Sequence, residues 1–531
     1  MDLSGYEPPI VPIGTNYLYE LPNQGDDGSQ SRFFLTTRPL RGTRVWEAIE
    51  VWSRKRPQRI RGAKPVVLKD VCIDSSRLTE KAIQKQLFGD IRAFASNPEW
   101  RKHPLLSKFD EADKDKLAEL FENDKFEDLF LRISMEHSTP ATKSNNDTHA
   151  SQHVEGENGA RVTETSKIRV VTVFEEVCTA LDDLQTLGEV IDIMKQTLLP
   201  LQLMMLAGWV HRDISSGNIL AFRKHNDAPW TVKLADLEYA KKWSPEAKQD
   251  DSKTGTAFFM PWEIQNRRRE RKSCRDPWII LIYDFQHDLE SIWWIWLWII
   301  TCRVLGWQYS RDLVAGIFVD IARPGDRRRE DAWGMGIPGL DIYIHEALKS
   351  FPPIIDRVRD RLVDLMIMHV QQPAEANFER FSEGHMLLKR GLEDLDATKP
   401  MWEDVKLEGH KEHRDKLAER GLLKQISKAK REKGNIVTRP PLEEPQATRA
   451  SQTPLKRLRD DSDRTTKARA EPNSTTRATR SKTASTLKDS LRNGVKRTVT
   501  GASVEAFRRV APKDSTTSKV GGTVRKRRRG S

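Results

Sequence analysis

The chain has 531 residues, of which 37% are hydrophobic, so it can bury a large core and should form more than one domain. Its formal net charge of +12 is uneven, because residues 426–531 carry 28 Lys and Arg against 10 Asp and Glu, and the preceding part carries 61 against 67. This balance predicts a mildly acidic globular body with a basic tail, and it argues against a nucleic-acid-binding body.

The sequence also argues against a secreted or membrane-spanning protein. The N-terminus lacks the positive start and apolar run of a secretory signal. The apolar run 292–302 has 11 residues, whereas a spanning helix needs about 20, so we expect a buried core helix there. Four cysteines without a C-x-x-C pair indicate neither a disulfide framework nor a zinc site, and a reducing compartment is the default.

The first elements in chain order form a predicted β-rich region. Residues 1–31 contain Pro-Pro and Asp-Asp-Gly without sustained periodicity, so we expect a partly disordered lead-in. Three β-prone runs follow between residues 32 and 73. A helix is predicted from Ser75, because its apolar residues recur at helical spacing. These residues are Ala82, Ile83, Leu87 and Ile91.

Lys69 ends the apolar run V-V-L-K within this region. The pattern is typical of a lysine that neutralises the α- and β-phosphates of ATP while pairing with a carboxylate on the next helix. Glu80, near the start of that helix, is the candidate partner. The alternative is that both residues are surface charges. Only Gly42 stands where a phosphate-covering G-x-G-x-x-G loop is expected, and a single glycine is weak support for a phosphate cradle.

We interpret residues 95–166 as an insertion, charged and helical at first, then polar, low in complexity and disordered. A buried strand is predicted at residues 170–174. Glu175–Cys178 would follow it as a hinge whose backbone could pair with an adenine edge. Glu176 and Cys178 are the candidate nucleotide-binding residues of this hinge.

A possible catalytic loop follows the hinge. His211, Arg212 and Asp213 are followed by Asn218 at the spacing H-R-D-x-x-x-x-N. In phosphoryl transfer, the aspartate of this pattern accepts the proton of the attacking hydroxyl, and the asparagine holds a metal ion. The alternative is a buried turn in which Asp213 and Asn218 satisfy backbone donors.

A second candidate metal ligand, Asp236, ends a predicted strand 23 residues after Asp213. At this place the phosphoryl-transfer pattern has D-F-G, whose aspartate binds the Mg²⁺ that bridges the β- and γ-phosphates. Leu237 keeps the apolar character of the phenylalanine. Glu238 replaces the glycine and so removes backbone freedom.

The segment Gly255–Glu263, which reads G-T-x-x-F-M-x-x-E, has the spacing of the end of an activation segment, on which protein acceptors dock. Ser252 and Thr254 precede it. A phosphate on either would have Arg212 as a cation to order against. Asp288, at the head of a Trp-rich helix, is expected to anchor the backbone of the catalytic loop from below.

The globular unit is expected to end near residues 394–399, and residues 400–531 to form a basic, largely disordered tail. Two basic runs in the tail, starting at Lys456 and Val524, resemble nuclear-import signals. They predict a nuclear or nucleocytoplasmic protein whose tail binds import receptors. The alternative is a solvated tail that binds acidic partners loosely.

In this order the motifs resemble the eukaryotic protein-kinase superfamily over about residues 32–396, and more narrowly the fungal-type protein kinases. The resemblance lies in HRDIS-x-GNI, D-hydrophobic-acidic-x-A, G-T-x-x-F-M and H-D-L-E-S. It implies an α+β fold of two lobes, a small β-rich one at about 32–176 and a larger helical one at about 179–399. It also implies ATP and Mg²⁺ as cofactors and Ser or Thr hydroxyls of protein substrates as acceptors. The shortness of the apolar run, in turn, predicts no membrane partner.

One residue departs from the kinase pattern. Ser215 stands two residues after Asp213, where Ser/Thr kinases place a lysine that contacts the γ-phosphate, and it cannot replace that charge. A pseudokinase scaffold and a small-molecule phosphotransferase therefore remain as alternatives. The residues that the resemblance implies for the site are Lys69, Arg212, Asp213 and Asn218 for catalysis, Asn218 and Asp236 for the metal, and Gly42, Lys69, Glu80, Glu176 and Cys178 for the nucleotide.

Overall fold

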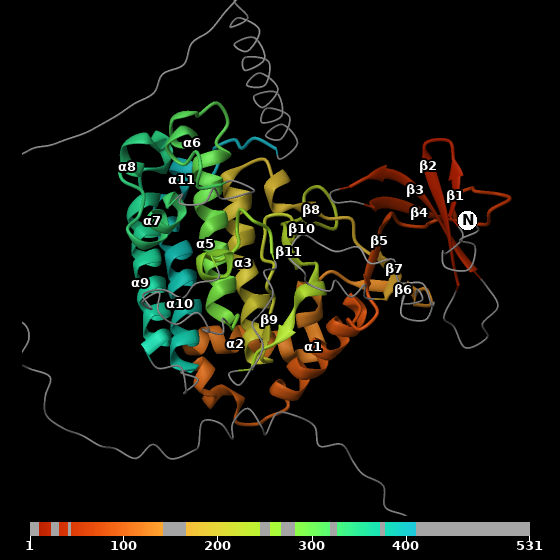
Figure 1. The fold of residues 1–531 in the computed structure, drawn as a ribbon, viewed down its shortest axis with the longest axis horizontal. Helices are drawn as coiled ribbons and strands as arrows, with labels where there is room; N and C mark the ends of the chain where they lie inside the picture. The colour runs from red at the N-terminus through yellow and green to blue at the C-terminus, as the bar shows by residue number, and fades with distance from the viewer. Residues whose placement is uncertain are drawn as a thin grey trace, which may run out of the picture. The chain divides into compact units, whose positions relative to one another are not determined.

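The computed structural model has a β-rich N-terminal part followed by a larger helical part (Figure 1). This arrangement confirms the expected α+β fold of two lobes. The structure describes residues 10–22, 31–40, 44–141, 166–244, 255–266, 282–318, 327–371 and 378–409. All of these residues belong to one compact unit.

The small lobe is built on an antiparallel sheet whose strands lie in the order β1-β2-β3-β4-β5-β7-β6. Its central strands are rich in β-branched residues, since β5 reads VVLKDVCID and β7 reads KIRVVTVF. β7 is buried over most of its length because β5 and β6 flank it. The strands are β1 Ile10–Ile13, β2 Asn16–Pro22, β3 Ser31–Pro39, β4 Val45–Val51, β5 Val66–Asp74, β6 Ile133–Ser138 and β7 Lys167–Phe174.

β1 and β2 correct the expectation of a partly disordered lead-in. β2 pairs with β3 and buries Leu18, Tyr19 and Leu21 in the lobe. The two strands have only 4 and 7 residues, which is too short a stretch for sustained periodicity in the sequence. The folded lobe therefore begins near residue 10 instead of residue 32.

The segment 95–166 is also not a single insertion. Its first part is helical and buries apolar residues such as Leu105 and Leu117 in the core of the large lobe. The charged part ends in a strand, β6, which pairs with β7. Residues 142–165 lie outside the described residues, so disorder there stays a prediction. The helical pieces are η1 Trp100–Lys102, η2 Pro104–Leu106, α2 Glu111–Phe121 and η3 Glu122–Leu129.

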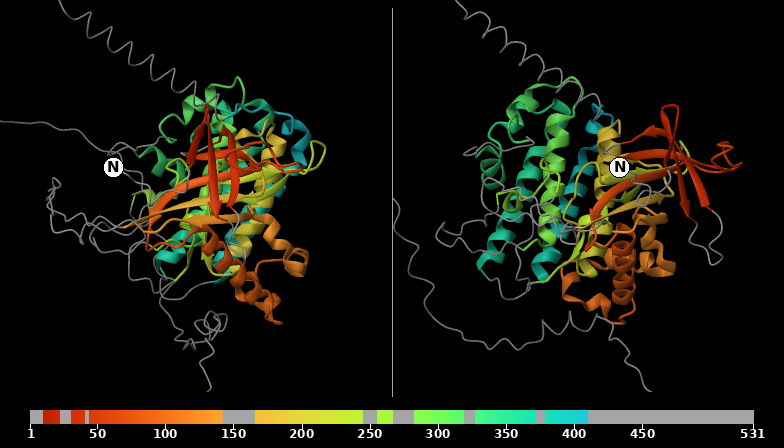
Figure 2. Two further views of the ribbon diagram at one scale, coloured as in Figure 1. Left: turned by 90° about the vertical axis from the view of Figure 1, so that its right-hand side faces the viewer. Right: turned by 45° about the vertical axis from the view of Figure 1, so that its right-hand side comes forward.

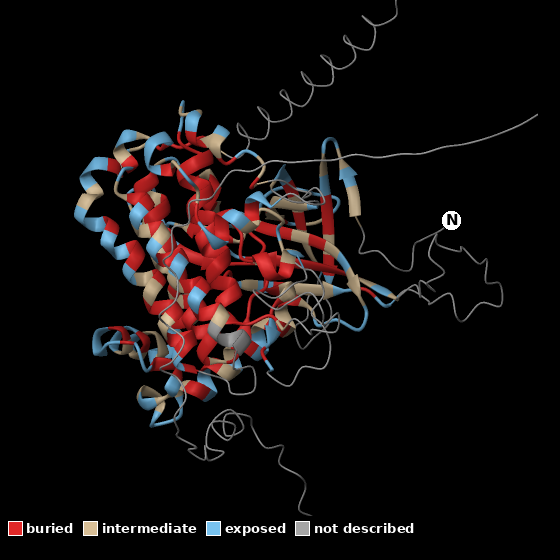
Figure 3. Ribbon diagram, turned by 60° about the vertical axis from the view of Figure 1, so that its left-hand side comes forward, coloured by how far each residue is buried: buried red, intermediate tan, exposed pale blue. Residues whose placement is uncertain are grey.

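The large lobe is built around α5, Phe285–Cys302, all of whose residues are buried (Figure 3). The predicted core helix is therefore confirmed. Within the described ranges, no helix combines the length and apolar character needed to cross a membrane. The other helices of this lobe are α3 Leu187–Leu206, α4 Trp262–Asn266, α6 Tyr309–Leu313, α7 Arg328–Gly334, α8 Leu340–Tyr343, α9 Phe351–Gln371, α10 Phe378–Asp394 and α11 Lys399–Trp402, with short turns η5 Leu181–Asp183, η6 Leu237–Tyr239, η7 Glu346–Leu348 and η8 Leu395–Thr398.

Short strands between the sheet and the long helices bring the loops of the site together (Figure 2). β9 ends just before His211, β10 begins just after Asn218, and β11 ends shortly before Asp236. β10 pairs with both β8 and β11, and β9 pairs with β12. The loop that carries His211–Asn218 and the loop that carries Asp236 are thereby placed side by side. These strands are β8 Thr179–Ala180, β9 Trp209–Val210, β10 Ile219–Phe222, β11 Thr231–Leu234 and β12 Lys241–Lys242.

The large lobe extends past the predicted end at residue 399. Trp402 is fully buried, and Leu407 forms a β-bridge with Val304. The buried Arg303 side chain donates to the backbone oxygen of Glu408 at 2.8 Å. These contacts correct the boundary to about residue 408. Residues 410–531, with both basic runs, lie outside the described part of the chain.

Candidate active site

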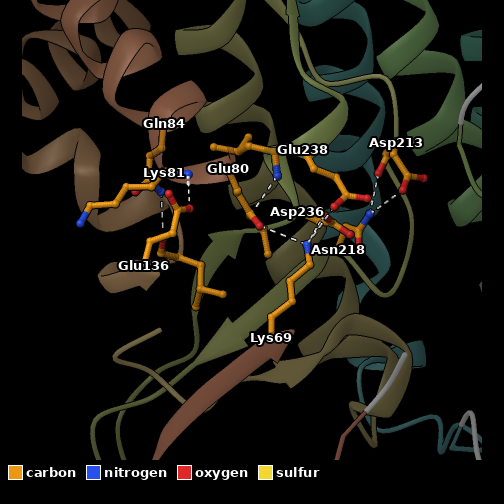
Figure 4. A network of polar contacts seen from close by, with 12 residues as sticks. Lys69, Glu80, Lys81, Gln84, Glu136, Asp213, Asn218, Asp236 and Glu238 are labelled. Atoms are coloured by element: carbon orange, nitrogen blue, oxygen red, sulfur yellow. Dashed lines mark hydrogen bonds and ion pairs between the residues drawn. The ribbon is translucent and has the colours of Figure 1, made fainter. Parts of the chain in front are cut away.

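Lys69 and Glu80 form the ion pair that the sequence predicts. Lys69 lies on β5, and its Nζ is 3.1 Å from Glu80 Oε2. Glu80 is the first residue of α1, Glu80–Ala95, because Thr79 caps that helix by accepting a hydrogen bond from the Ala82 N–H. Glu136 of β6 accepts hydrogen bonds from Thr79 Oγ1 and from the Lys81 N–H and so holds the same helix start (Figure 4).

Two further carboxylates contact Lys69. Its Nζ lies 2.7 Å from Asp236 Oδ1 and 3.4 Å from Glu238 Oε2 (Figure 4). Burial lowers the pKa of Lys69, but Glu80, Asp236 and Glu238 together outweigh it and raise that pKa well above its ordinary value. The ammonium group is therefore charged, and three carboxylates accept its hydrogen bonds. Nothing in the sequence reading anticipated the contact of Glu238 with Lys69.

Residues 236–239, which contain the predicted metal ligand Asp236 and are called the metal segment below, are held against α1. The Leu237 N–H donates to Glu80 Oε1 at 3.2 Å, and Leu237 is buried, as expected of an apolar anchor. Asp236 has a φ of 63°, a left-handed conformation that is uncommon for residues other than glycine. Burial raises the pKa of Glu80, and Lys69 offsets this only in part. Glu80 therefore links the lysine to the metal segment.

Asp213 and Asn218 meet as the spacing predicts. Asn218 Nδ2 donates to Asp213 O at 2.8 Å and to Asp213 Oδ2 at 3.1 Å. The other carboxylate oxygen of Asp213 accepts from Thr256 N and Thr256 Oγ1, at 2.8 and 3.0 Å. Burial raises the pKa of Asp213, and nearby Asp236 adds to the increase. Sequence reasoning missed Thr256, although it is the threonine of the G-T pair that opens the predicted docking segment, Gly255–Glu263.

Asp288 anchors the catalytic loop as predicted. Its carboxylate accepts hydrogen bonds from the backbone N–H groups of His211 and Arg212, at 2.7 and 3.0 Å. Tyr283 OH donates to the same carboxylate at 3.1 Å. Arg212 has a φ of 72°, so the turn before Asp213 depends on these bonds. Ser252 and Thr254, the possible phosphate partners of Arg212, lie outside the described residues.

The docking segment Gly255–Glu263 rests on a buried polar layer. Arg329 of α7 donates to the backbone oxygens of Phe258 and Met260, both at 2.8 Å, and stacks over the Trp294 ring at 3.9 Å. From α5, Glu290 Oε1 accepts from the Trp262 N–H at 2.6 Å, and His287 lies 3.4 Å from Glu263. Sequence reasoning missed these supporting roles, because no motif marks Arg329, and the H-D-L-E-S motif contains His287 and Glu290 without indicating what they support.

Comparison with known families agrees with this geometry. The model of the fungal protein kinase family matches residues 5–300, which is more than half of the chain. The match includes all the site residues described above except Arg329 of α7. The chain belongs to the fungal protein kinases. No curated protein matches it. The matched range starts before β1, in agreement with the early start of the small lobe.

The nucleotide side of this fungal protein kinase is described only in part. Gly42 lies in residues 41–43, outside the described ranges. Arg44 follows directly, with a φ of 67°, and its guanidinium donates to the buried Asp70 at 2.7 Å. Tyr19 and Arg169 also donate to Asp70, so β2, β5 and β7 are joined on the sheet face opposite Lys69.

The predicted hinge follows β7. The Glu176 carboxylate is 2.7 Å from Lys233 Nζ and accepts from the Arg132 N–H at 3.1 Å, so its side chain has structural partners. Burial raises the pKa of Cys178 to about 12, which keeps its thiol neutral. Neither side chain is placed to act chemically. A nucleotide role for both residues stays a prediction about their backbone.

The residues present fit a magnesium ion. Asn218 and Asp236 offer an amide and a carboxylate oxygen, the ligands that hard divalent cations prefer. Asn218 uses its amide nitrogen toward Asp213, which leaves its amide oxygen for a cation. No group of three or more His, Cys, Asp or Glu suited to a metal occurs in the described ranges. A cation here would therefore depend on phosphate oxygens and water as well.

Proposed function

We propose that this fungal protein kinase transfers the γ-phosphoryl group of Mg-ATP to Ser or Thr hydroxyls of protein substrates. The observation that carries the proposal is the convergence of two sets of side chains from distant parts of the chain. Lys69 with Glu80 and Asp236 is one set, and Asp213 with Asn218 is the other (Figure 4). A buried turn with a structural role alone would not need both sets.

Each residue has a role in the proposed reaction. Lys69 neutralises the nucleotide phosphates, and Asn218 and Asp236 would hold Mg²⁺, which would neutralise phosphate charge when bound. Asp213 accepts the proton of the attacking hydroxyl. Asn218 and Thr256 orient its carboxylate, and the burial that raises its pKa makes it a stronger base than an exposed aspartate.

The docking segment supports a protein acceptor over a small molecule. An enzyme that acts on a small molecule needs no extended surface for a polypeptide, yet the segment Gly255–Glu263 is fixed from below by Arg329 and Glu290. The choice of Ser or Thr as acceptor rests on the family resemblance. The pseudokinase alternative draws support from Ser215, which leaves the γ-phosphate without the usual lysine.

The proposal is tested by transfer of label from γ-labelled Mg-ATP to generic protein acceptors, with the full chain. We expect labelled protein with the wild type and a loss of at least about 10²-fold with Asp213→Asn, which removes the base but keeps the side-chain shape. Asp341→Asn, on the exposed surface of α8, is the matched control and should keep the wild-type rate. Label that is absent, or independent of Asp213, would refute the proposal.

The basic runs of the tail support nuclear import as a further part of the proposal, with import receptors or acidic proteins as partners. A tagged chain that lacks Lys456–Arg459 and Val524–Ser531 should accumulate outside the nucleus. An unchanged distribution would refute the signals.

A further inference from the structure

Lys69 has no free donor in this structure. A lysine ammonium group has three N–H donors, and Glu80, Asp236 and Glu238 accept one each. In protein kinases, the equivalent lysine pairs with one carboxylate of the following helix and with the nucleotide phosphates. One of the three carboxylates must therefore release the ammonium group before it can contact phosphate.

Two of the three carboxylates are not free to leave. Glu80 is buried at the start of α1, and its second oxygen accepts from the Leu237 N–H. Asp236 makes the shortest contact, 2.7 Å, and is the proposed metal ligand. Glu238 makes the longest contact, 3.4 Å, and has no proposed role as a metal ligand. Glu238 is therefore the carboxylate that exchanges most easily.

The backbone around Glu238 is held by contacts of its own, while the Glu238 carboxylate also accepts a hydrogen bond from the Tyr239 hydroxyl. Arg77 donates to the backbone oxygen of Glu238 at 2.9 Å and stacks over the Tyr239 ring at 5.0 Å. These contacts join the metal segment to the connection between β5 and α1. The Glu238 side chain can therefore leave Lys69 without moving Asp236 or the backbone.

We propose that Glu238 is a positioning residue that occupies on Lys69 the place the nucleotide phosphates take, and so competes with them for the ammonium group. The three carboxylates use all three donors of the ammonium group, so phosphate can bind Lys69 only when one carboxylate withdraws. Glu238 thus keeps Lys69 in position without nucleotide and weakens nucleotide binding. This inference rests on the proposed function, because it assumes a nucleoside triphosphate as ligand.

The test measures equilibrium binding of a fluorescent ATP analogue to the full chain, in excess Mg²⁺ and without an acceptor. Glu238→Gln keeps the shape and removes the charge, and it should lower the dissociation constant by roughly 3- to 30-fold. The control is Asp74→Asn. It removes a carboxylate at the end of β5, the strand that carries Lys69, where Asp74 pairs with Lys167, and it should leave the dissociation constant unchanged.

A double-mutant cycle shows whether the effect passes through Lys69. In a Lys69→Met background, Glu238→Gln should no longer tighten binding, because there is no ammonium group to release. Tightening that persists without Lys69 would overturn the competition. If Glu238→Gln lowers stability without nucleotide, Glu238→Asp serves as a second variant, since its shorter side chain keeps the charge but loses the contact and should also tighten binding.

The remaining outcomes separate the inference from the proposed function. A wild type that binds no nucleotide would refute both. A wild type that binds, with Glu238→Gln equal to it, would refute the inference alone. Weaker binding by Glu238→Gln together with a higher Mg²⁺ requirement would also overturn it, because that result would make Glu238 a metal ligand.

Discussion

The proposed site has a nucleotide end, around Lys69, and a docking end, beneath the segment Gly255–Glu263. The charged side chains at the two ends differ in how deeply they are buried. At the nucleotide end, Asp236 and Glu238 contact Lys69 with side chains that are 29% and 21% exposed. At the docking end, Arg329 and Glu290 lie buried beneath the segment they support. Partly exposed ion pairs exchange partners at lower cost than fully buried ones, because a buried polar group is costly to leave without a partner. The nucleotide end is therefore suited to rearrange, and the docking end to stay fixed.

The sharpest way to break this comparison is to remove one charge from each end. Arg329→Met leaves the backbone oxygens of Phe258 and Met260 without their donor, so we expect a loss of about 3 kcal/mol in the free energy of unfolding. Glu238→Gln should change it by less than about 1 kcal/mol. Chemical denaturation measures both. The control Arg328→Met alters an exposed neighbour, and losses of equal size at Arg329 and Glu238 would contradict the comparison.

The docking end should also show a distinct pH dependence. His287 lies between Asp284 and Glu263, and although burial lowers its pKa, these carboxylates raise the pKa to about 10. Because this value exceeds that of the unfolded chain, about 6.5, the contribution of His287 is complete below pH 6.5 and is lost as the pH rises to about 10.

His287→Gln should therefore lower the free energy of unfolding at pH 6.5 by about 2 kcal/mol and by much less at pH 10. Denaturation curves across this range measure the difference. A difference between wild type and variant that is constant with pH would show that His287 is neutral in the folded protein.

Thr256 lies where the two ends meet and should give the smallest effect. Thr256→Val removes one of the hydrogen bonds to Asp213, so we expect kcat to fall about 10-fold while nucleotide binding is unchanged. The hydrogen bonds of Thr256 lower the pKa of Asp213, so their loss should move the acidic limb of the kcat profile to higher pH. Thr231→Val, on β11, is the control. Unchanged kcat would exclude an orienting role.

Sequence reasoning located the charged centre of the site and one of its supports, Asp288, but not the supports of the docking segment. Lys69, Asp213, Asn218 and Asp236 could be found because phosphoryl transfer requires these residue types at set spacings. Asp288 could be found for the same reason. Each motif is local in the sequence and could be recognised there, although the contacts join segments as far apart as Lys69 and Asp236.

The supports depend on contacts between distant segments. Arg329 belongs to a run of three arginines that reads as a solvated surface, and only its burial against Trp294 distinguishes it. β6 occurs in a charged stretch, and its partner β7 begins well after the intervening residues. Tyr19 of β2 is buried and donates a hydrogen bond to Asp70 of β5. The hairpin of β1 and β2 is therefore stabilised by the rest of the sheet, and its own sequence shows no strong alternation of apolar and polar residues.

The central claim is that Asp213 serves as the base for phosphoryl transfer to a protein hydroxyl. The most direct measurement is acid hydrolysis of acceptor protein labelled from γ-labelled Mg-ATP, with the wild type and Asp213→Asn compared. The account predicts labelled phosphoserine or phosphothreonine with the wild type and at least about 100-fold less with the variant. Equal label with both proteins, or label confined to small molecules, would contradict it.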